Sequence, residues 1–278
     1  MIRSDVAAVM LCWNDVARVC ALARRLERLE PAPGRTIIVD NGSRADTAVR
    51  IAEGAPPCEI IALGRNHGFA AAINRGIDAA IAGGAQWVWV LNTDVELPGA
   101  ALGELLSAAE RDPGCGMAAA VLLEADGAVL AFGGGRVNLW TGLSRHVQRS
   151  GERCDYLVGA CLLLRTAMLR DVGLFDESYF FYWEDIELSF RAREAGWRLA
   201  VAESCRVVHL EGSSLGRWSD ERWYHLFRGL TRFLAARSPL PRVATALRLA
   251  QHSATMLRHG RAAALRGAWR AVAGGSGR

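Results

Sequence analysis

Side chains that can bind a cation or a phosphate group stand directly after several short apolar runs of the sequence. Carboxylate and amide oxygens together with one imidazole suit Mn²⁺ or Mg²⁺ better than Zn²⁺, which prefers closed sets of thiolates and histidines. The pattern therefore predicts a divalent-cation site, although the same residue types also form turns and helix caps. The residues are Asn14, Asp40, Asn41, Asn92, Asp94 and His209.

A second group of residues could transfer a proton. Four aromatic residues at 180–183 are followed directly by Glu184 and Asp185. A carboxylate beside an apolar wall can have a raised pKa and act as a general base. The alternative is that both acids only complement the dipole of a helix above a core aromatic cluster. Taken alone, these residues leave both interpretations open.

The elements that must position these side chains follow an α/β pattern. Apolar runs rich in β-branched residues alternate with segments of helical period, which is typical of a mainly parallel sheet. Ligands of such sheets bind beyond the carboxyl ends of the strands, where the polar residues above fall. A glycine cluster at 133–135 and the residues to 142 predict a mobile loop. We expect strands at 6–12, 36–39, 59–63, 87–91, 117–123, 129–132 and 205–209, a further apolar run at 157–164, and helices at 17–29, 69–82, 98–111 and 184–195.

The composition of this 278-residue chain excludes two classes of enzyme. All 33 basic residues are arginine. A Walker A loop and Schiff-base chemistry both need a lysine, so neither is possible. The seven cysteines form no C-x-x-C pair, which indicates scattered reduced thiols. Because the chain has neither a signal-peptide pattern nor an apolar run of about 18 residues, we expect a cytoplasmic protein.

The C-terminal segment 217–278 differs from the rest of the chain in charge. It contains 12 arginines and two acids, a net charge of +10, whereas the whole chain carries +4. We predict helices broken by Pro239 and Pro241, the first of which packs on the preceding domain. The stretch 241–269 combines arginines with apolar residues, which favours an anionic membrane surface as its partner. No aromatic stacking platform accompanies the charge, so we expect no nucleic-acid partner.

The order of seven short motifs resembles family 2 glycosyltransferases of the GT-A fold, in the rhamnosyltransferase-like bacterial branch. The resemblance spans about residues 6–214, and the motifs occur in the order that the family has. They are 40–43, 65–69 with 74–76, 92–94, 158–161, 173–177, 183–185 and His209.

The resemblance implies roles for individual residues. It implies that Asp40 contacts the nucleotide base or ribose, that Asp94 and His209 hold Mn²⁺ or Mg²⁺ on the donor diphosphate, and that Asp185 is the catalytic base. Asn92 departs from the Asp-x-Asp form of the family, which puts the metal affinity in question. Trp183 and Glu184 are expected to form the acceptor side of the site. Further donor-binding residues are expected to be Asn14, Asn41, Arg65, Asn66, Gly68, Asn74 and Asn92.

The expected activity is an inverting sugar transfer, because one base and no second carboxylate nucleophile suit direct displacement. The resemblance implies dTDP-rhamnose as the first choice of donor, a UDP-hexose as the second, and a surface-glycan or lipid-linked acceptor. We expect a GT-A domain at 1–216, with a nucleotide-sugar half at 1–97 and an acceptor half at 98–216. Residues 217–278 would be a basic helical tail peripheral to the inner face of the cytoplasmic membrane.

Three other functions share features with this sequence. A nucleotidyltransferase shares the α/β layout and the metal chemistry, and a non-catalytic sugar-binding protein could keep the fold without the reaction. Residues 212–216 fit the G-x-S-x-G nucleophile elbow of serine hydrolases, with Asp220 and His225 after it. The elbow requires a helix that begins at the serine, and the sequence favours a loop there instead.

Overall fold

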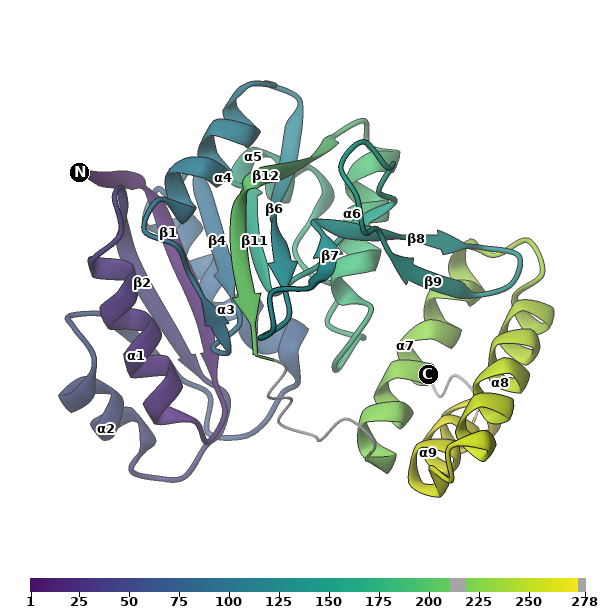
Figure 1. Cartoon of the computed structure of the whole chain (residues 1–278). Helices are drawn as coiled ribbons and strands as arrows, with labels where there is room; N and C mark the ends of the chain where they lie inside the picture. Colours follow the sequence, from purple (N-terminus) through teal and green to yellow (C-terminus); the bar gives the residue numbers. More distant parts are fainter. Residues whose placement is uncertain (211–218, 275–278) are drawn as a thin grey trace.

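The computed structural model describes residues 1–210 and 219–274, and within them the core is a nine-stranded sheet. Its strand order is β3-β2-β1-β4-β11-β6-β12-β5, with β7 paired to β6 (Figure 1). A second sheet has the order β10-β8-β9. The strands of the large sheet are β1 (Ile2–Cys12), β2 (Ala32–Asp40), β3 (Glu59–Ala62), β4 (Trp87–Leu91), β5 (Val95–Glu96), β6 (Cys115–Leu123), β7 (Val129–Phe132), β11 (Cys161–Arg165) and β12 (Arg198–His209), and those of the small sheet are β8 (Gly134–Asn138), β9 (Leu143–His146) and β10 (Tyr156–Leu157).

The prediction of a mainly parallel sheet is correct for one half of the molecule. Strands β3, β2, β1 and β4 are all parallel neighbours. In the other half, β11 lies between β4 and β6 and runs antiparallel to both. The apolar run at 157–164 divides into β10 and β11, and because β11 is reached from the small sheet without a crossover helix, it enters in the opposite direction. The central sheet is therefore mixed.

Helices cover both faces of the large sheet (Figure 1). One face packs against α1, α2 and α4, and the other packs against α3, α5 and α6. The alternation of β1 shows why, since Ala8 and Met10 belong to the first core cluster while Ala7 and Val9 belong to the second. The helices are α1 (Val16–Glu27), α2 (Thr47–Gly54), α3 (Phe69–Ala82), α4 (Ala101–Glu110), α5 (Thr166–Val172) and α6 (Glu184–Glu194).

The prediction of a mobile loop at 133–142 is wrong for the first half of that segment. Gly134 and Gly135 belong to β8, which pairs with β10 and with β9. A Cβ atom on Gly134 would lie 1.9 Å from the backbone oxygen of Tyr156. The glycines therefore allow two strands to approach closely. The sequence alone does not distinguish glycines that serve this purpose from glycines in a flexible loop.

Three helices follow the large sheet in the described part of the chain: α7 (Asp220–Arg237), α8 (Pro241–Arg258) and α9 (Ala262–Ala273). The packing expected for the first of them is present. Phe227, Leu230 and Phe233 of α7 share a core cluster with Trp183 and Ile186. Helices α8 and α9 in turn pack on α7. Within residues 1–210 and 219–274, no helix combines the length and apolar composition needed to cross a bilayer.

Candidate active site

Three connected pockets lie beyond the carboxyl ends of β1, β2 and β4. Their volumes are about 300, 190 and 340 Å³. Phe69 and Phe181 line all three, so the pockets are adjacent, and we refer to them together as the depression. The pockets are lined in turn by Asn41 with Asn66, by Asp94 with His209, and by Glu184 with Asp185.

Two asparagines form the first pocket and fasten its loops together. The side-chain N–H₂ of Asn41 donates to Asn66 Oδ1 at 3.0 Å and to the Gly68 carbonyl at 3.1 Å. The backbone N–H of His67 donates to Asn41 Oδ1 at 2.9 Å. Asn41 is buried, so these bonds satisfy groups that would otherwise be costly to bury. The loop after β3 is thus held against the loop after β2.

The loop after β2 is braced from both sides. Asp40 is buried, and its Oδ1 accepts the Ser43 N–H at 3.0 Å. The N–H of Asn14 donates to Ser43 Oγ at 2.8 Å. Gly42 has φ of +71°, and a Cβ there would lie 2.1 Å from the backbone carbon of Arg65. Only glycine fits this approach of two loops.

Four residues of the predicted donor set do not line these pockets: Asn14 and Asp40, which brace the loop after β2, and Arg65 and Asn74. Asn74 is buried on α3, where it donates to the Phe175 carbonyl at 2.9 Å and accepts the Phe175 N–H at 3.2 Å. It also donates to Glu177 Oε1 at 3.2 Å. Arg65 is exposed and donates to His67 Nε2 at 3.4 Å. Asn74 thus fixes the loop before α6 from outside the depression.

Asp94 and His209 come together in the second pocket because their strands pair. His209 lies opposite Val95 in the antiparallel pairing of β12 with β5, and the Leu210 N–H donates to the Asp94 carbonyl at 2.9 Å. His209 Nε2 lies 3.2 Å from Asp94 Oδ1. Asn92 lines the same pocket. Two residues separated by 115 positions thus present one oxygen and one nitrogen ligand to the same space.

These residues fit a divalent cation that shares its ligands with a bound diphosphate. His209 Nδ1 is buried and has no hydrogen-bond partner among the described residues. The contact of Nε2 with Asp94 therefore leaves one ring nitrogen of the imidazole unsatisfied. The described residues contain no cluster of three protein ligands. Mg²⁺ commonly takes only one or two carboxylates and completes its shell with phosphate oxygens and water. The pair is therefore sufficient for a cation carried in with a phosphorylated ligand.

Glu184 is buried and Asp185 is half-buried at the start of α6, and both line the third pocket. Asp185 Oδ2 accepts the Gly159 N–H at 2.9 Å, and its Oδ1 accepts its neighbour's N–H, that of Ile186, at 2.8 Å. Burial raises the pKa of Asp185, while these two hydrogen bonds act to lower it. Burial, aided by the charge of Asp185, raises the pKa of Glu184 to about 8. The charge of Asp185 therefore acts with burial to keep Glu184 protonated at neutral pH.

The two residues before these acids have strained backbones. Tyr182 has φ of 70° and Trp183 has φ of 76°, in the left-handed region that side chains other than glycine rarely adopt. Helix α7 presses on them, because a Cβ on Gly229 would lie 2.7 Å from the Tyr182 oxygen. Arg222 of α7 lies over the Tyr182 ring at 5.4 Å. Such strain persists only where the surrounding packing enforces it, and it is concentrated at functional sites.

Several residues of the depression were not found from the sequence. Ser144, His146 and Tyr156 come from the small sheet, and Arg222 and Leu226 come from α7. His146 Nδ1 lies 3.2 Å from the Leu130 oxygen, and the imidazole is near enough to Asp185 to lower its pKa. No motif marks these residues, since they enter through tertiary packing. The elbow candidate at 212–216 lies outside the described residues.

Comparison with known proteins gives the family and the fold. The model of the family described as glycosyltransferase like family 2 matches residues 4–225. A mannosyltransferase from Pyrobaculum calidifontis, solved with GDP-Man and Mn²⁺, has a TM-score of 0.58 at 16% identity and covers 97% of this chain and 74% of its own. The structure of GalNAc-T7 with UDP, GalNAc and Mn²⁺ has a TM-score of 0.58 at 14% identity, over 95% of this chain and 53% of the other. These likenesses show a GT-A-like fold.

Curated relatives are similar in sequence as well. An N-acetylglucosaminyl-diphospho-decaprenol L-rhamnosyltransferase from Mycobacterium tuberculosis is 32% identical over 212 residues, which cover 66% of this chain and 69% of the relative. A pre-mycofactocin glycosyltransferase from the same organism is 29% identical over 240 residues, covering 84% of this chain and 48% of the relative.

Proposed function

The chain belongs to glycosyltransferase like family 2, and we propose that it moves a sugar, with inversion, from a nucleotide-diphosphate sugar to a hydroxyl group of a lipid-linked acceptor. One observation carries the proposal: a pair that can hold a cation, Asp94 with His209, and an acid at the start of α6, Asp185, line adjacent pockets. The similarity to a rhamnosyltransferase that acts on a diphospho-decaprenol supports both the acceptor class and dTDP-rhamnose as the first choice of donor, with a UDP-hexose as the second.

The donor would bind along the first two pockets. The nucleoside would lie by Asn41 and Asn66, near the loop that Asp40 stabilises, and the diphosphate would lie by Asp94 and His209. Mn²⁺ or Mg²⁺ held by Asp94 and His209 would neutralise the charge that develops on the leaving diphosphate. The solved structures of similar fold that contain Mn²⁺ support this choice of metal.

The acceptor would bind in the third pocket. Its hydroxyl group must lose a proton as it attacks the anomeric carbon, and the ionised Asp185 would accept that proton. The protonated Glu184 would donate a hydrogen bond to the acceptor, beside the wall formed by Trp183. With one ionised carboxylate in the pocket and no second one as a nucleophile, a single displacement inverts the configuration of the anomeric carbon.

The division of the chain proposed from the sequence fits this scheme with one addition. Residues 1–97 would bind the donor and residues 98–216 the acceptor, while the helical segment 217–278 closes the acceptor pocket through Arg222 and Leu226. A lipid-linked acceptor would place the enzyme at the inner face of the cytoplasmic membrane as a peripheral protein.

The test of the proposal is the Asp185→Asn variant. Loss of a general base should lower kcat by about 10²–10⁴-fold. The affinity for the donor should stay at the wild-type value, because Asp185 lies outside the first two pockets. Turnover above a tenth of the wild-type value would assign the base to another group, with Glu184 the first to examine.

A further inference from the structure

Helix α8 has two apolar faces, and only one of them is covered. Ala244, Leu249, His252 and Met256 are buried against the rest of the helical segment. At 100° per residue, the exposed apolar residues of α8 fall within about 100° of the helix circumference, on the opposite side. They are Val243, Ala246, Leu247, Ala250, Ala254 and Leu257.

We call the exposed apolar residues of α8 the uncovered stripe. It contains large apolar side chains, which are unusual on a helix face that only contacts water. Leu257 is 69% exposed, and Val243 and Leu247 are each about half exposed. Leu240, at the start of the helix, and Trp269 of α9 are also exposed beside it. The indole N–H of Trp269 donates to Ser253 Oγ at 3.1 Å, which fixes the ring against α8.

The charge around the stripe has a single sign. Residues 238–274 contain six arginines and no acidic residue. Arg242, Arg258 and Arg266 are exposed, whereas Arg270 pairs with Asp220 at 2.8 Å. An apolar face bordered by arginines is the arrangement that binds the interface of an anionic bilayer.

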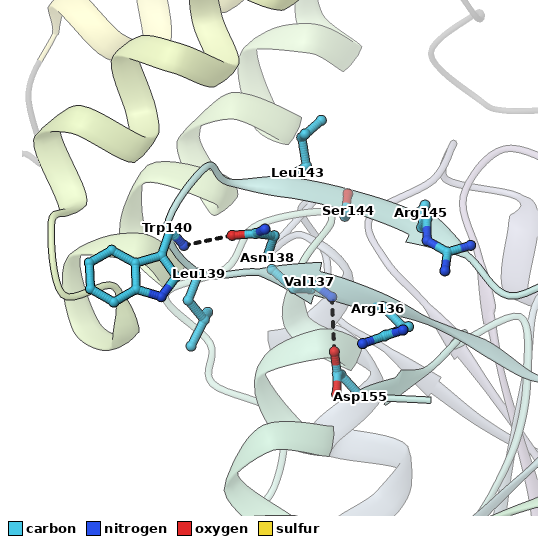
Figure 2. A pocket seen from close by; sticks show the side chains of 9 residues that line it. All are labelled: Arg136, Val137, Asn138, Leu139, Trp140, Leu143, Ser144, Arg145 and Asp155. Atoms are coloured by element: carbon cyan, nitrogen blue, oxygen red, sulfur yellow. Dashed lines mark hydrogen bonds between the residues drawn. The ribbon is translucent and has the colours of Figure 1, made fainter. Parts of the chain in front are cut away.

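The hairpin of β8 and β9 packs against the helical segment on the covered side of α8. Its turn touches the helices, since a Cβ on Gly142 would lie 3.0 Å from Leu234 Cδ1 and 3.3 Å from the Ala244 oxygen. Trp140 at the tip is 61% exposed (Figure 2). Arg136 and Arg145 lie directly opposite each other across the ladder and line a cavity of about 600 Å³. Arg145 pairs with Glu152 at 3.6 Å, and Asp155 lines the same cavity, so acidic residues of the chain itself offset these like charges.

We propose that the stripe on α8, together with Trp269, docks on the surface of a bilayer that contains anionic phospholipid. A second copy of the chain fits this face less well, because a two-fold contact would place the arginine-rich, acid-free segment against itself. The β8–β9 hairpin joins the docked helix to the acceptor pocket, since its turn contacts Ala244 of α8 and its Ser144 lines the pocket.

The test compares binding of the full-length protein to vesicles of phosphatidylcholine alone and of phosphatidylcholine mixed with phosphatidylglycerol. The wild type should co-sediment with the mixed vesicles, and added salt should weaken the binding. Replacing Val243, Leu247 and Leu257 together by serine should lower the partition coefficient about tenfold or more. The control replaces the exposed Ile2 of β1 and Val49 of α2 by serine. Helix α2 lies at the opposite end of the molecule from α8 (Figure 1), so this variant should bind as the wild type does.

A second variant, with Arg242, Arg258 and Arg266 replaced by glutamine, leaves the apolar stripe intact. It should lose the preference for mixed vesicles. Equal partitioning of the wild type and the serine variant, or equal binding of the wild type to both vesicles, would overturn the proposal. So would a lipid-free dimer that the serine variant abolishes. The experiment uses neither donor nor acceptor, so its failure is distinguishable from failure of the proposed sugar transfer.

Discussion

Replacing Glu184 by glutamine should remove a free-energy penalty that grows with pH. The carboxyl group is buried, and its Oε2 has no hydrogen-bond partner within the described residues. Burial, aided by the charge of Asp185, raises the pKa of Glu184 from an ordinary value of 4.5 to about 8. At about 1.4 kcal/mol per unit of pKa, the shift corresponds to an upper limit of about 5 kcal/mol.

The sign follows from which state holds the proton. As the pH rises above the ordinary pKa, the unfolded chain loses the Glu184 proton while the folded protein keeps it. The wild type therefore loses stability from this group between about pH 4.5 and about pH 8, and the loss is complete above the folded-state pKa. The Glu184→Gln variant, which cannot ionise, has no such loss. Its advantage over the wild type should grow across this window by up to a few kcal/mol.

Urea unfolding of the two proteins at several pH values measures the difference directly. All other titrating groups are shared, so they cancel when the two free energies of unfolding are subtracted. Glu53→Gln, a change at an exposed position on α2, is the control for the loss of a carboxyl group. A difference between Glu184→Gln and the wild type that does not vary with pH would refute the reasoning, because it would mean that Glu184 ionises in the folded protein as it does in water.

Two further perturbations test the cation pair and the strained loop. Replacing Asp94 or His209 by alanine should weaken donor binding about tenfold or more when Mn²⁺ or Mg²⁺ is present, and much less in EDTA, as measured by calorimetry. An equal loss of affinity in EDTA would argue against metal ligation. Gly229→Ala should force the Tyr182 backbone away from α7, which lowers Tm and kcat together by the equivalent of about 1–3 kcal/mol. Unchanged values would show that the loop does not need this contact.

The parallel half of the sheet, and the polar groups at its edge, could be predicted from local patterns. Alternating strands and helices place the carboxyl ends of β1, β2 and β4 at one edge, so that residues after each strand converge. The sequence therefore indicated Asn41 and Asp94 as neighbours of one depression. The same strand-end pattern grouped His209 with Asp94, but the pairing of β5 with β12 that brings the two side chains together leaves no periodic signal.

The acceptor side could not be predicted in the same way. Gly134 and Gly135 have low strand propensity. They belong to a sheet because β8 pairs with β10 and β9, and the backbone of Tyr156 approaches too closely for a larger residue at 134. The position of His146 near Asp185 depends on that sheet. Where tertiary packing decides the secondary structure, a local pattern predicts the wrong element, and any site residue on that element is lost with it.

The helical segment shows a different limit, because α8 is apolar on two sides. From the sequence alone, Leu249 and Met256 are as good candidates for membrane contact as Leu247 and Leu257. In the structure the first two are buried and the other two are exposed. The pattern of burial therefore determines which residues of α8 a membrane could contact. It also decides how that surface must be tested. Truncating the chain after residue 238 would uncover the core shared with α7, the helix that supplies Arg222 to the acceptor pocket, whereas surface substitutions on α8 leave that core intact.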